Sequence, residues 1–383
     1  MPWKEQDVVS QRIEFVVRAV KRTESISKLC REYGISRETG HQWLKRFEKA
    51  GSFSALLDQS RRPCRSPQET SAQVEEQVVQ LRRQTGWGGK KMQDVLKQEQ
   101  GLKLSARTID RIVKRKGLIH SDDQPNRATQ RFQRTQPNEL WQMDFKGHYP
   151  TNDGKCFPLS ILDDHSRYVV GLYPLRHPDL GSVERRLMET IQQYGVPEAM
   201  LMDHGTPWWG SSNEYGLSRL SVNLIEQGVR LIYSGIGHPQ TQGKVERFHR
   251  TLKRSLRYRG VPRRFHDWEP VLKAIQQEYN HRRPHEALNM ARPAQRYQVS
   301  ARRWLDRPSE WEYPHGSEVR RLNRQGAFFF ANHYRYVSLA LAGRQVRLER
   351  AADKVLVIYR HMVVRELDLT TGQTKTFVYP LTE

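Results

Sequence analysis

The sequence predicts a multidomain protein with an α-helical N-terminal third, an α/β core and a small all-β C-terminal barrel. Three observations predict this order. Apolar residues recur at helical spacing up to about residue 120, strand patterns alternate with helices over residues 139–300, and short alternating strands fill residues 316–383. A chain of 383 residues also has room for two to four domains.

The chain is strongly basic. It has 64 Lys and Arg residues against 42 Asp and Glu, which gives a formal net charge of +22. This excess indicates a polyanionic partner, and we expect double-stranded DNA. A membrane is not expected, because no apolar stretch approaches the roughly 20 residues that span a bilayer. The three cysteines are scattered and the first residues are charged, so we expect a reducing cytoplasm.

Residues 1–58 are predicted to form a helix-turn-helix DNA-binding domain. Leu29 lies on the apolar face of one helix, Gly34 breaks that helix, and Ser36 can cap the next one. The polar residues that face outward from the second helix would contact DNA: Arg37, His41, Gln42, Lys45 and Arg46. An ordinary helical hairpin with a solvated face is the alternative, and the net charge favours DNA binding.

A basic linker over residues 59–68 and a second helical unit over residues 69–120 follow. Pro63 and Pro67 exclude a continuous helix through the linker. Its arginines would bind backbone phosphates: Arg61, Arg62 and Arg65. We expect the second unit to be a winged helix-turn-helix domain, in which the helix after Ser105 directs four basic residues outward: Arg107, Arg111, Lys114 and Arg115. Two linked modules would gain affinity through effective concentration.

Residues 121–138 are polar and without periodicity, which predicts a second linker before the core at 139–300. Three carboxylates of the core have unusual positions. Asp144 and Asp203 end apolar strand patterns, in LWQMDFKG and AMLMDHG, and Glu246 starts a strongly basic helix. Ligand sites in α/β sheets lie at strand ends. Three carboxylates that meet would repel one another, and their hard oxygen ligands suit Mg²⁺, or Mn²⁺ in its place.

This arrangement near a DNA-binding surface predicts a site with two metal ions. One ion would activate water and later a DNA 3′-hydroxyl, while the other, roughly 4 Å away, would stabilise the leaving oxygen. Arg250 lies one helical turn after Glu246, on the same face, and would hold the DNA strand. Further DNA contacts are expected around the start of this helix: Pro239, Gln240, Gln242 and Lys244.

Other polar residues have plainer interpretations. Asp163 and Asp164 could bind metal, but a DDHS turn between two strands is favoured. Asp153 in TNDGK is expected at the turn of a hairpin. Trp208 and Trp209 could stack on bases, and packing under an inserted segment is an equal alternative.

The motifs WQMDFKG, DDHSR, LMDHG, GHPQTQGKVERFHRTLK and YNHRRPHEAL occur in that order. Together they resemble the core of integrase-type transposases of bacterial insertion sequences, in particular the groups numbered 3 and 481, which are related more distantly to retroviral integrases. The resemblance covers about residues 10–300. It implies a ribonuclease H-like fold with a catalytic triad of Asp144, Asp203 and Glu246. Many relatives also have a basic residue seven positions after the Glu, which assigns a catalytic role to Lys253.

One spacing departs from the family. Between Asp203 and Glu246 lie 42 residues, more than is usual, and we assign the surplus to an insertion at about 207–222. The resemblance implies a transposase that binds the terminal inverted repeats of its element, cleaves the ends and joins the 3′-hydroxyls to target DNA. It would act as a homo-oligomer, a dimer or tetramer, on DNA in the bacterial nucleoid.

Two other functions remain open. The chain could be a catalytically inactive protein that binds the ends and represses, or a metal-dependent nuclease of the same fold. The intact triad argues against the first, and two helix-turn-helix units are unexplained by the second. The C-terminal barrel could bind DNA or a neighbouring subunit, or could be a structural cap.

Overall fold

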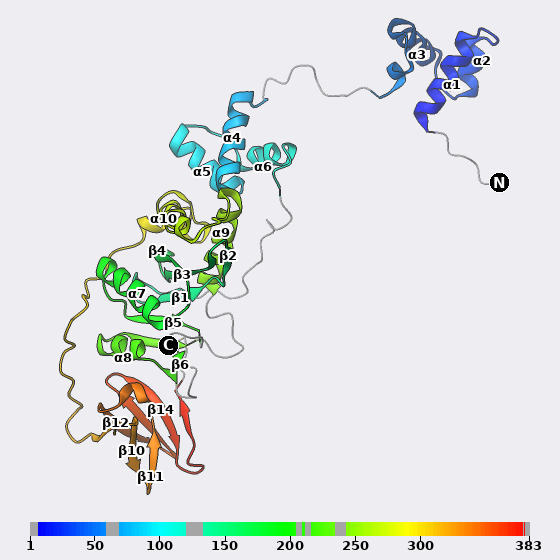
Figure 1. Ribbon diagram of the computed structural model, residues 1–383. Coiled ribbons are helices and arrows are strands. Elements are labelled where there is room, and N and C mark those ends of the chain that lie inside the picture. The colour runs from blue at the N-terminus through cyan, green and yellow to red at the C-terminus, as the bar shows by residue number, and fades with distance from the viewer. Residues whose placement is uncertain are drawn as a thin grey trace. The chain divides into compact units, whose positions relative to one another are not determined.

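The computed structural model describes residues 7–58, 69–119, 133–203, 209–210, 216–233, 243–377 and 379 (Figure 1). The chain divides into two compact units, Met1–Thr70 and Ser71–Glu383. Within the described ranges, every helix is too short or too polar to cross a membrane.

The first unit is a small helical domain. Its helices are α1 Val8–Val20, α2 Ile26–Glu32 and α3 Arg37–Ala50, followed by a 3-10 turn, Phe53–Leu56. The hydroxyl of Ser36 accepts a hydrogen bond from the N–H of Thr39 at 3.1 Å, which fixes the start of α3. Phe15, Leu29 and Leu44 are buried at the centre. The predicted helix-turn-helix is therefore present as α2 and α3.

The second unit begins with three more helices, α4 Ala72–Thr85, α5 Gly89–Gln100 and α6 Ala106–Arg115. Ser105 caps α6 by accepting from the N–H of Thr108 at 3.1 Å. Val79, Leu96 and Ile109 contribute to a separate core beneath these helices. All of residues 69–119 are described and none forms a strand, so the wing that the sequence predicted does not occur in this range.

A mixed sheet forms the centre of the second unit. Its strands are β1 Trp141–Phe145, β2 Tyr149–Thr151, β3 Gly154–Asp163, β4 Val169–Leu175, β5 Ala199–Met202 and β8 Arg230–Tyr233. The order is β4-β3-β1-β5-β8, and β2 pairs with the start of β3. β3 is antiparallel to β1, whereas β1, β5 and β8 are parallel. A small ladder, β6 Trp209–Gly210 with β7 Gly216–Leu217, follows β5.

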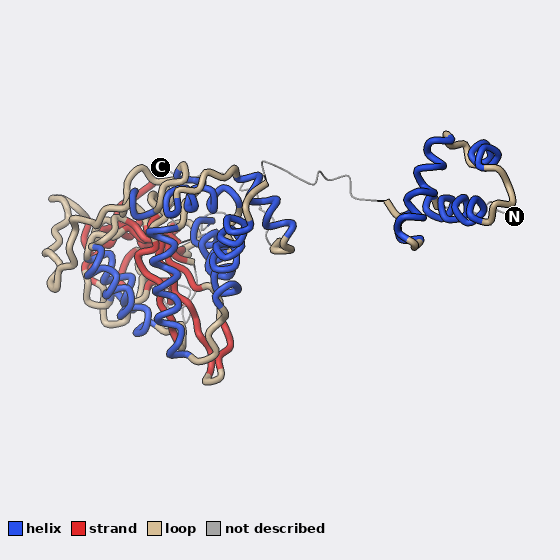
Figure 2. Tube along the Cα trace, turned by 90° about the horizontal axis from the view of Figure 1, so that it is seen from above, coloured by secondary structure: helices blue, strands red, loops and turns tan. Residues whose placement is uncertain are grey.

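Helices cover both faces of this sheet (Figure 2). α7 Leu180–Tyr194 and α8 Arg219–Glu226 pack on the side to which Trp141 and Met143 point. α9 Gly243–Arg259 and α10 Trp268–Gln277 pack on the other side, over Leu162 and Leu172. A single π turn, Glu278–Arg282, and short 3-10 turns follow α10. Residues that alternate along β1 and β3 therefore reach different cores, as expected for a strand covered on both faces.

The C-terminal region is all-β, but the barrel predicted from the sequence is not closed. The strands β9 Glu318–Arg321, β12 Gln345–Ala351, β13 Lys354–Tyr359, β14 Met362–Asp368 and β15 Thr374–Thr376 form one sheet in the order β15-β14-β13-β12-β9. β10 Ala327–Phe330 and β11 His333–Tyr336 form a separate hairpin. No pairing joins the two edges of the five-stranded sheet among the described residues.

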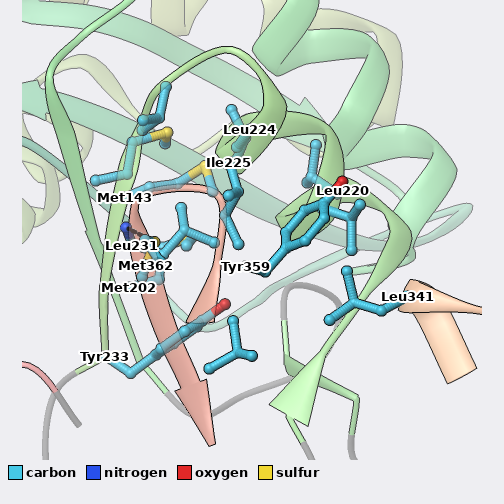
Figure 3. Packing of buried hydrophobic residues seen from close by; sticks show 14 of the residues in the cluster. Met143, Met202, Leu220, Leu224, Ile225, Leu231, Tyr233, Leu341, Tyr359 and Met362 are labelled. Carbon is cyan, nitrogen blue, oxygen red and sulfur yellow. Dashed lines mark hydrogen bonds between the residues drawn. The ribbon is translucent and has the colours of Figure 1, made fainter. Parts of the chain in front are cut away.

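The apolar face of the open sheet belongs to the same continuous cluster of buried residues as one face of the core. Tyr359 packs near Leu220 of α8, and Met362 lies beside Leu231 of β8 and Met202 of β5, as Figure 3 shows. The hydroxyl of Tyr359 also donates to the carboxylate of Glu226 at 2.6 Å. Contact with the neighbouring domain therefore removes part of this face from water, although the sheet is not closed into a barrel.

Candidate active site

Two carboxylates lie side by side at one end of the central sheet. β1 and β5 are parallel neighbours, with Gln142 opposite Leu201. Asp144 and Asp203 each follow two residues after this pair, so continuation of the register would place them opposite one another. Neighbouring strands lie about 4.8 Å apart, and side chains directly opposite one another point to the same face. The sheet therefore brings these two carboxyl groups together.

Glu246 comes from the helix that crosses the same face. The N–H of Val245 donates to Oε1 of Gln142 at 3.2 Å, and Nδ1 of His249 lies 3.6 Å from Oδ2 of Asp144. Glu246 lies between Val245 and His249 along α9, in the first turn of the helix, and is exposed. The helix thus carries this third carboxylate past the end of β1.

The charges of the three groups act on one another. Burial raises the pKa of Asp144 to about 7, and the negative charges of Asp203 and Glu246 add to this effect. The N–H of Phe145, which donates to Oδ1 of Asp144 at 2.8 Å, opposes it. A carboxyl group with such a pKa is partly protonated near neutral pH, which is typical of clustered acids that have no cation between them.

The donor set suits a hard divalent cation, which would replace the proton and relieve the repulsion. Across the described ranges, no three Asp, Glu, His or Cys side chains are gathered closely enough to enclose an ion. Joint binding of Mg²⁺ by Asp144, Asp203 and Glu246 therefore requires a closer approach of these side chains.

His249 is a buried neighbour of the carboxylates. Burial lowers the pKa of its imidazole to about 3, and the positive charge of Lys146 adds to the shift. One ring nitrogen lies 3.1 Å from Oγ of Ser160 and the other faces Asp144. A neutral ring held from both sides restricts the orientation of the Asp144 carboxylate.

Asp163 and Asp164 form the turn that the sequence favoured and lie within a buried network. Asp163 accepts from the N–H groups of Ser166 and Asn138, both at 2.7 Å. Asp164 accepts from Nε2 of Gln142 at 2.8 Å and forms an ion pair with Lys244. Each carboxylate is fully buried and paired with donors of the protein.

Lys244 is therefore a correction to the predicted DNA contacts. Its side chain is only 15% exposed, and its ammonium group faces Asp164 within the fold. Burial lowers the pKa of Lys244 to about 8, while the Asp164 carboxylate acts in the opposite direction. A buried carboxylate needs a nearby cation, and Lys244 supplies it.

The other predicted DNA contacts are distributed over three helices. The exposed ones on α3 are Arg37, His41, Gln42 and Lys45, those on α6 are Arg107, Arg111, Lys114 and Arg115, and those on α9 are Arg250 and Lys253. Arg46 makes contacts within its own domain: its guanidinium lies 4.9 Å from the ring of Trp43 and donates to the carbonyl of Leu57. Seven further residues lie outside the described ranges: Arg61, Arg62, Arg65, Trp208, Pro239, Gln240 and Gln242.

The second helical domain contacts the core beside α9. A Cβ added to Gly86, at the end of α4, would lie 2.4 Å from the ring of Tyr258 near the end of α9. Arg282 donates to both carboxylate oxygens of Glu99 at 2.7 Å. Two further ion pairs join α5 to the segment after α10: Lys91 with Glu286, and Asp94 with Arg292. The helix of Glu246 thus also packs against the second helical domain.

Sequence reasoning did not predict the contacts that Gln142, Asp164 and His249 make around the carboxylates. For Asp164, the sequence did contain one indication that the carboxylate is paired. A strand as apolar as PLSILDD buries a charge at its end only when partners are supplied from elsewhere in the chain. The identity of those partners depends on long-range packing, which the local pattern does not contain.

Comparison with known families identifies this region. Two models described as integrase core domain match residues 134–239 and 227–293. The chain contains an integrase core. A helix-turn-helix domain model matches residues 11–63, and a homeodomain-like domain model matches residues 39–113. The helical N-terminal domains and the ribonuclease H-like core predicted from the sequence are thereby confirmed.

Transposases are among the relatives of this integrase core. The transposase for insertion sequence element IS904 of Lactococcus lactis is 27% identical over 47% of this chain and 68% of its own length. The transposase for transposon Tn552 of Staphylococcus aureus is 26% identical over 32% of this chain. The Pol polyprotein of feline endogenous virus ECE1 is 30% identical over 36% of this chain. The chain spans only 27% and 12% of the latter two proteins.

Solved structures of retroviral proteins also match. The HTLV-2 integrase catalytic core domain in complex with magnesium is 16% identical and covers 43% of this chain and 99% of its own, with a TM-score of 0.34. The simian T-cell lymphotropic virus intasome in complex with a PP2A regulatory subunit is 14% identical and covers 79% of this chain and 99% of its own, with a TM-score of 0.39.

Proposed function

We propose that the protein is a transposase that binds the terminal inverted repeats of an insertion sequence, cleaves the ends and joins the 3′-hydroxyls to target DNA. The observation that supports this most directly is that the charges of Asp203, at the end of β5, and of Glu246, in the first turn of α9, both act on Asp144 of β1. The similarity to the transposase for insertion sequence element IS904 agrees with it.

The chemistry consists of two displacements at phosphorus. In the first, a water oxygen bonds to the phosphorus at the element end, the P–O3′ bond breaks, and the 3′ oxygen leaves as a hydroxyl. In the second, that 3′-hydroxyl bonds to a phosphorus of the target and displaces the target's own 3′ oxygen. One phosphodiester bond is exchanged for another in the second step, so no external energy source is required.

Asp144, Asp203 and Glu246 would hold Mg²⁺, or Mn²⁺ in its place, and two such ions would supply the charge that activates the attacking oxygen and stabilises the leaving one. The side chains of the protein would position the DNA. Arg250 and Lys253 follow Glu246 at i+4 and i+7 on the exposed face of α9, where they would hold the DNA strand across the carboxylates.

DNA recognition would be divided between the two helical domains. The exposed basic residues of α3 and α6 would contact the bases and phosphates of the terminal repeat. Each of these two helices is the second helix of a helix-turn-helix pair. Two ends must be brought together before joining, so we propose that a dimer or tetramer of the chain acts on DNA.

Strand transfer in vitro tests this proposal. Duplexes that carry the inverted repeats flanking the coding region would be incubated with a supercoiled plasmid and Mg²⁺ or Mn²⁺, and joined products scored on a gel. Asp144→Asn, Asp203→Asn and Glu246→Gln should each reduce joining roughly 1,000-fold or more while DNA binding is retained. Asp353→Asn, an exposed turn residue, is the matched control.

The products separate this proposal from its two alternatives. A metal-dependent nuclease would cut branched or linear DNA without producing joined molecules. A catalytically inactive repressor would bind the repeats with neither cutting nor joining, and the Glu246→Gln variant would behave as the wild type. Joining that is indifferent to all three carboxylates would contradict the proposed site.

A further inference from the structure

We infer that Gln142, Asp164 and Lys244 form a positioning clamp that fixes the start of α9, and with it Glu246, relative to Asp144. None of the three is proposed to touch DNA or the reacting atoms. The inference rests on the proposed function, because it specifies how the chain places one member of the catalytic carboxylates.

The clamp is buried and its polar atoms are matched. Gln142 is 1% exposed and Asp164 is 0% exposed. Oδ1 of Asp164 accepts from Nε2 of Gln142 at 2.8 Å, and Oδ2 accepts from the N–H of Arg134 at 2.8 Å. Lys244 supplies the positive charge that balances the buried carboxylate. A buried carboxylate that loses its partners carries a large desolvation penalty. Movement of Gln142 or Lys244 away from Asp164 is therefore costly, and the network restricts their positions.

The carboxylate also fixes the orientation of the Gln142 amide. Because Nε2 donates to Asp164, Oε1 must face the opposite way, where it accepts from the N–H of Val245 at 3.2 Å. The first N–H groups of a helix have no partner within the helix, and one of them is satisfied here by a strand side chain. The backbone of α9 is thereby held at the residue that precedes Glu246.

The helix and the strand are in register over this contact. Val245 meets Gln142, and His249 meets Asp144. Four residues of helix advance about 6 Å, and two residues of strand advance about 6.6 Å, so both contacts can form at once. A slip of α9 by one residue would move Glu246 by about 1.5 Å along the helix and turn it by about 100° about the helix axis.

The test compares two equivalent glutamine substitutions. Gln142→Leu removes the bridge to α9. Gln276→Leu removes a different helix-to-sheet bond on the same face, in which Nε2 of Gln276 donates to the carbonyl of Val169 at 2.8 Å. Amide hydrogen exchange of residues 243–249 and the kcat and KM of strand transfer would be measured for the full-length protein and both variants.

We expect Gln142→Leu to accelerate exchange at the start of α9 and to lower kcat by about 100-fold, with KM for the terminal repeat unchanged. Gln276→Leu should change neither the exchange at residues 243–249 nor kcat. Normal exchange and normal kcat in Gln142→Leu would overturn the inference. Equal effects of the two substitutions would overturn it as well, since they would show only a general loss of packing.

A second variant covers the case in which Gln142→Leu does not fold. The double variant Asp164→Asn/Lys244→Met removes both buried charges together and should also accelerate amide exchange at the start of α9. The exchange measurement requires no activity. If wild-type protein joins no DNA, the proposed function fails while the clamp is still judged by its effect on residues 243–249.

Discussion

At the scale of single residues, the buried face that carries Asp144 is unusually polar. Gln142, Ser160 and Asp164 are each 1% exposed or less, and each has a partner in α9. Buried polar groups contribute little net stability even when they are satisfied, so an apolar interface would hold a helix there equally well. We interpret the polar pairs as a means of selecting one position of the helix among several.

His285 provides a residue-scale prediction about pH. Burial lowers its pKa well below the ordinary value of 6.5, and nearby Arg283 adds to the shift. In the unfolded chain this histidine binds a proton below pH 6.5, whereas in the folded chain it stays neutral. The free energy of unfolding should therefore fall as the pH drops from about 6.5, by up to about 1.4 kcal/mol per pH unit for this one group.

Denaturant unfolding at several pH values between 7 and 5 would measure this slope. His285→Gln, which keeps a side chain able to hydrogen-bond the hydroxyl of Tyr279, should show a shallower dependence than the wild type. His333→Gln on an exposed strand controls for the substitution itself. Parallel slopes for wild type and His285→Gln would contradict a buried neutral imidazole.

At the scale of elements, α9 has contacts at both ends. Its start is bonded to β1, and Tyr258 near its end packs against Gly86 of the second helical domain. Arg82 of α4 lies 5.7 Å from the ring of Tyr258 as well. One helix therefore both packs against the second helical domain and carries Glu246.

Substitution of Gly86 tests that contact. Gly86 has φ +67° and closes α4, while Gly101 has φ +69° and closes α5. A side chain in this backbone conformation costs roughly 1–2 kcal/mol wherever it occurs. Gly86→Ala should cost a further 1–3 kcal/mol or so, because its Cβ meets the Tyr258 ring, whereas a Cβ at Gly101 meets nothing.

The two variants are compared by their free energies of unfolding, and Gly101→Ala supplies the backbone penalty alone. A joint variant, Gly86→Ala/Tyr258→Ala, should recover most of the additional loss, since it removes the ring. Equal destabilisation by Gly86→Ala and Gly101→Ala would show that α4 does not pack on α9 in solution.

The elements themselves were largely predictable from the chain. The strands before Asp144 and Asp203, the DDHSR turn and the two helices capped by Ser36 and Ser105 have local signatures, and all of these elements occur as expected. Lys244 was misassigned to DNA because its partner Asp164 is 80 residues away in the sequence. A basic residue on a basic helix has no local feature that distinguishes a buried pair from a phosphate contact.

The same limit applies to the C-terminal strands. Alternation in Val346 and Leu348, and in Val355 and Val357, predicts strands with one apolar face, which the structure confirms. The pattern does not say what covers that face. A closed barrel and an open sheet require the same alternation, and the described strands form an open sheet.

At the scale of the whole molecule, the net charge of +22 predicts DNA binding that weakens steeply with salt. Arg107 and Arg111 are exposed on α6 and should each account for about 0.9 in the slope of log K against log salt, if each neutralises one phosphate. Removing both to Ala should lower the slope by about 2 and weaken binding to all sequences similarly.

Fluorescence anisotropy at a series of salt concentrations would measure these slopes. Arg186→Ala is the control, because Arg186 is paired with Glu189 and Glu269 at 2.9 and 3.0 Å. A double variant with the wild-type slope would show that α6 does not face the DNA backbone.

The C-terminal sheet also has a protective consequence. β8 is the last strand of the central sheet, and within the described ranges its only strand partner is β5. Its outer border is occupied by the C-terminal domain, where the N–H of Leu231 donates to Sδ of Met362 at 3.2 Å. An uncovered border of this kind is a template on which strands of other molecules can add. A core released from its C-terminal neighbour would thus acquire a surface prone to aggregation, so the two domains depend on each other for colloidal stability as well as for packing.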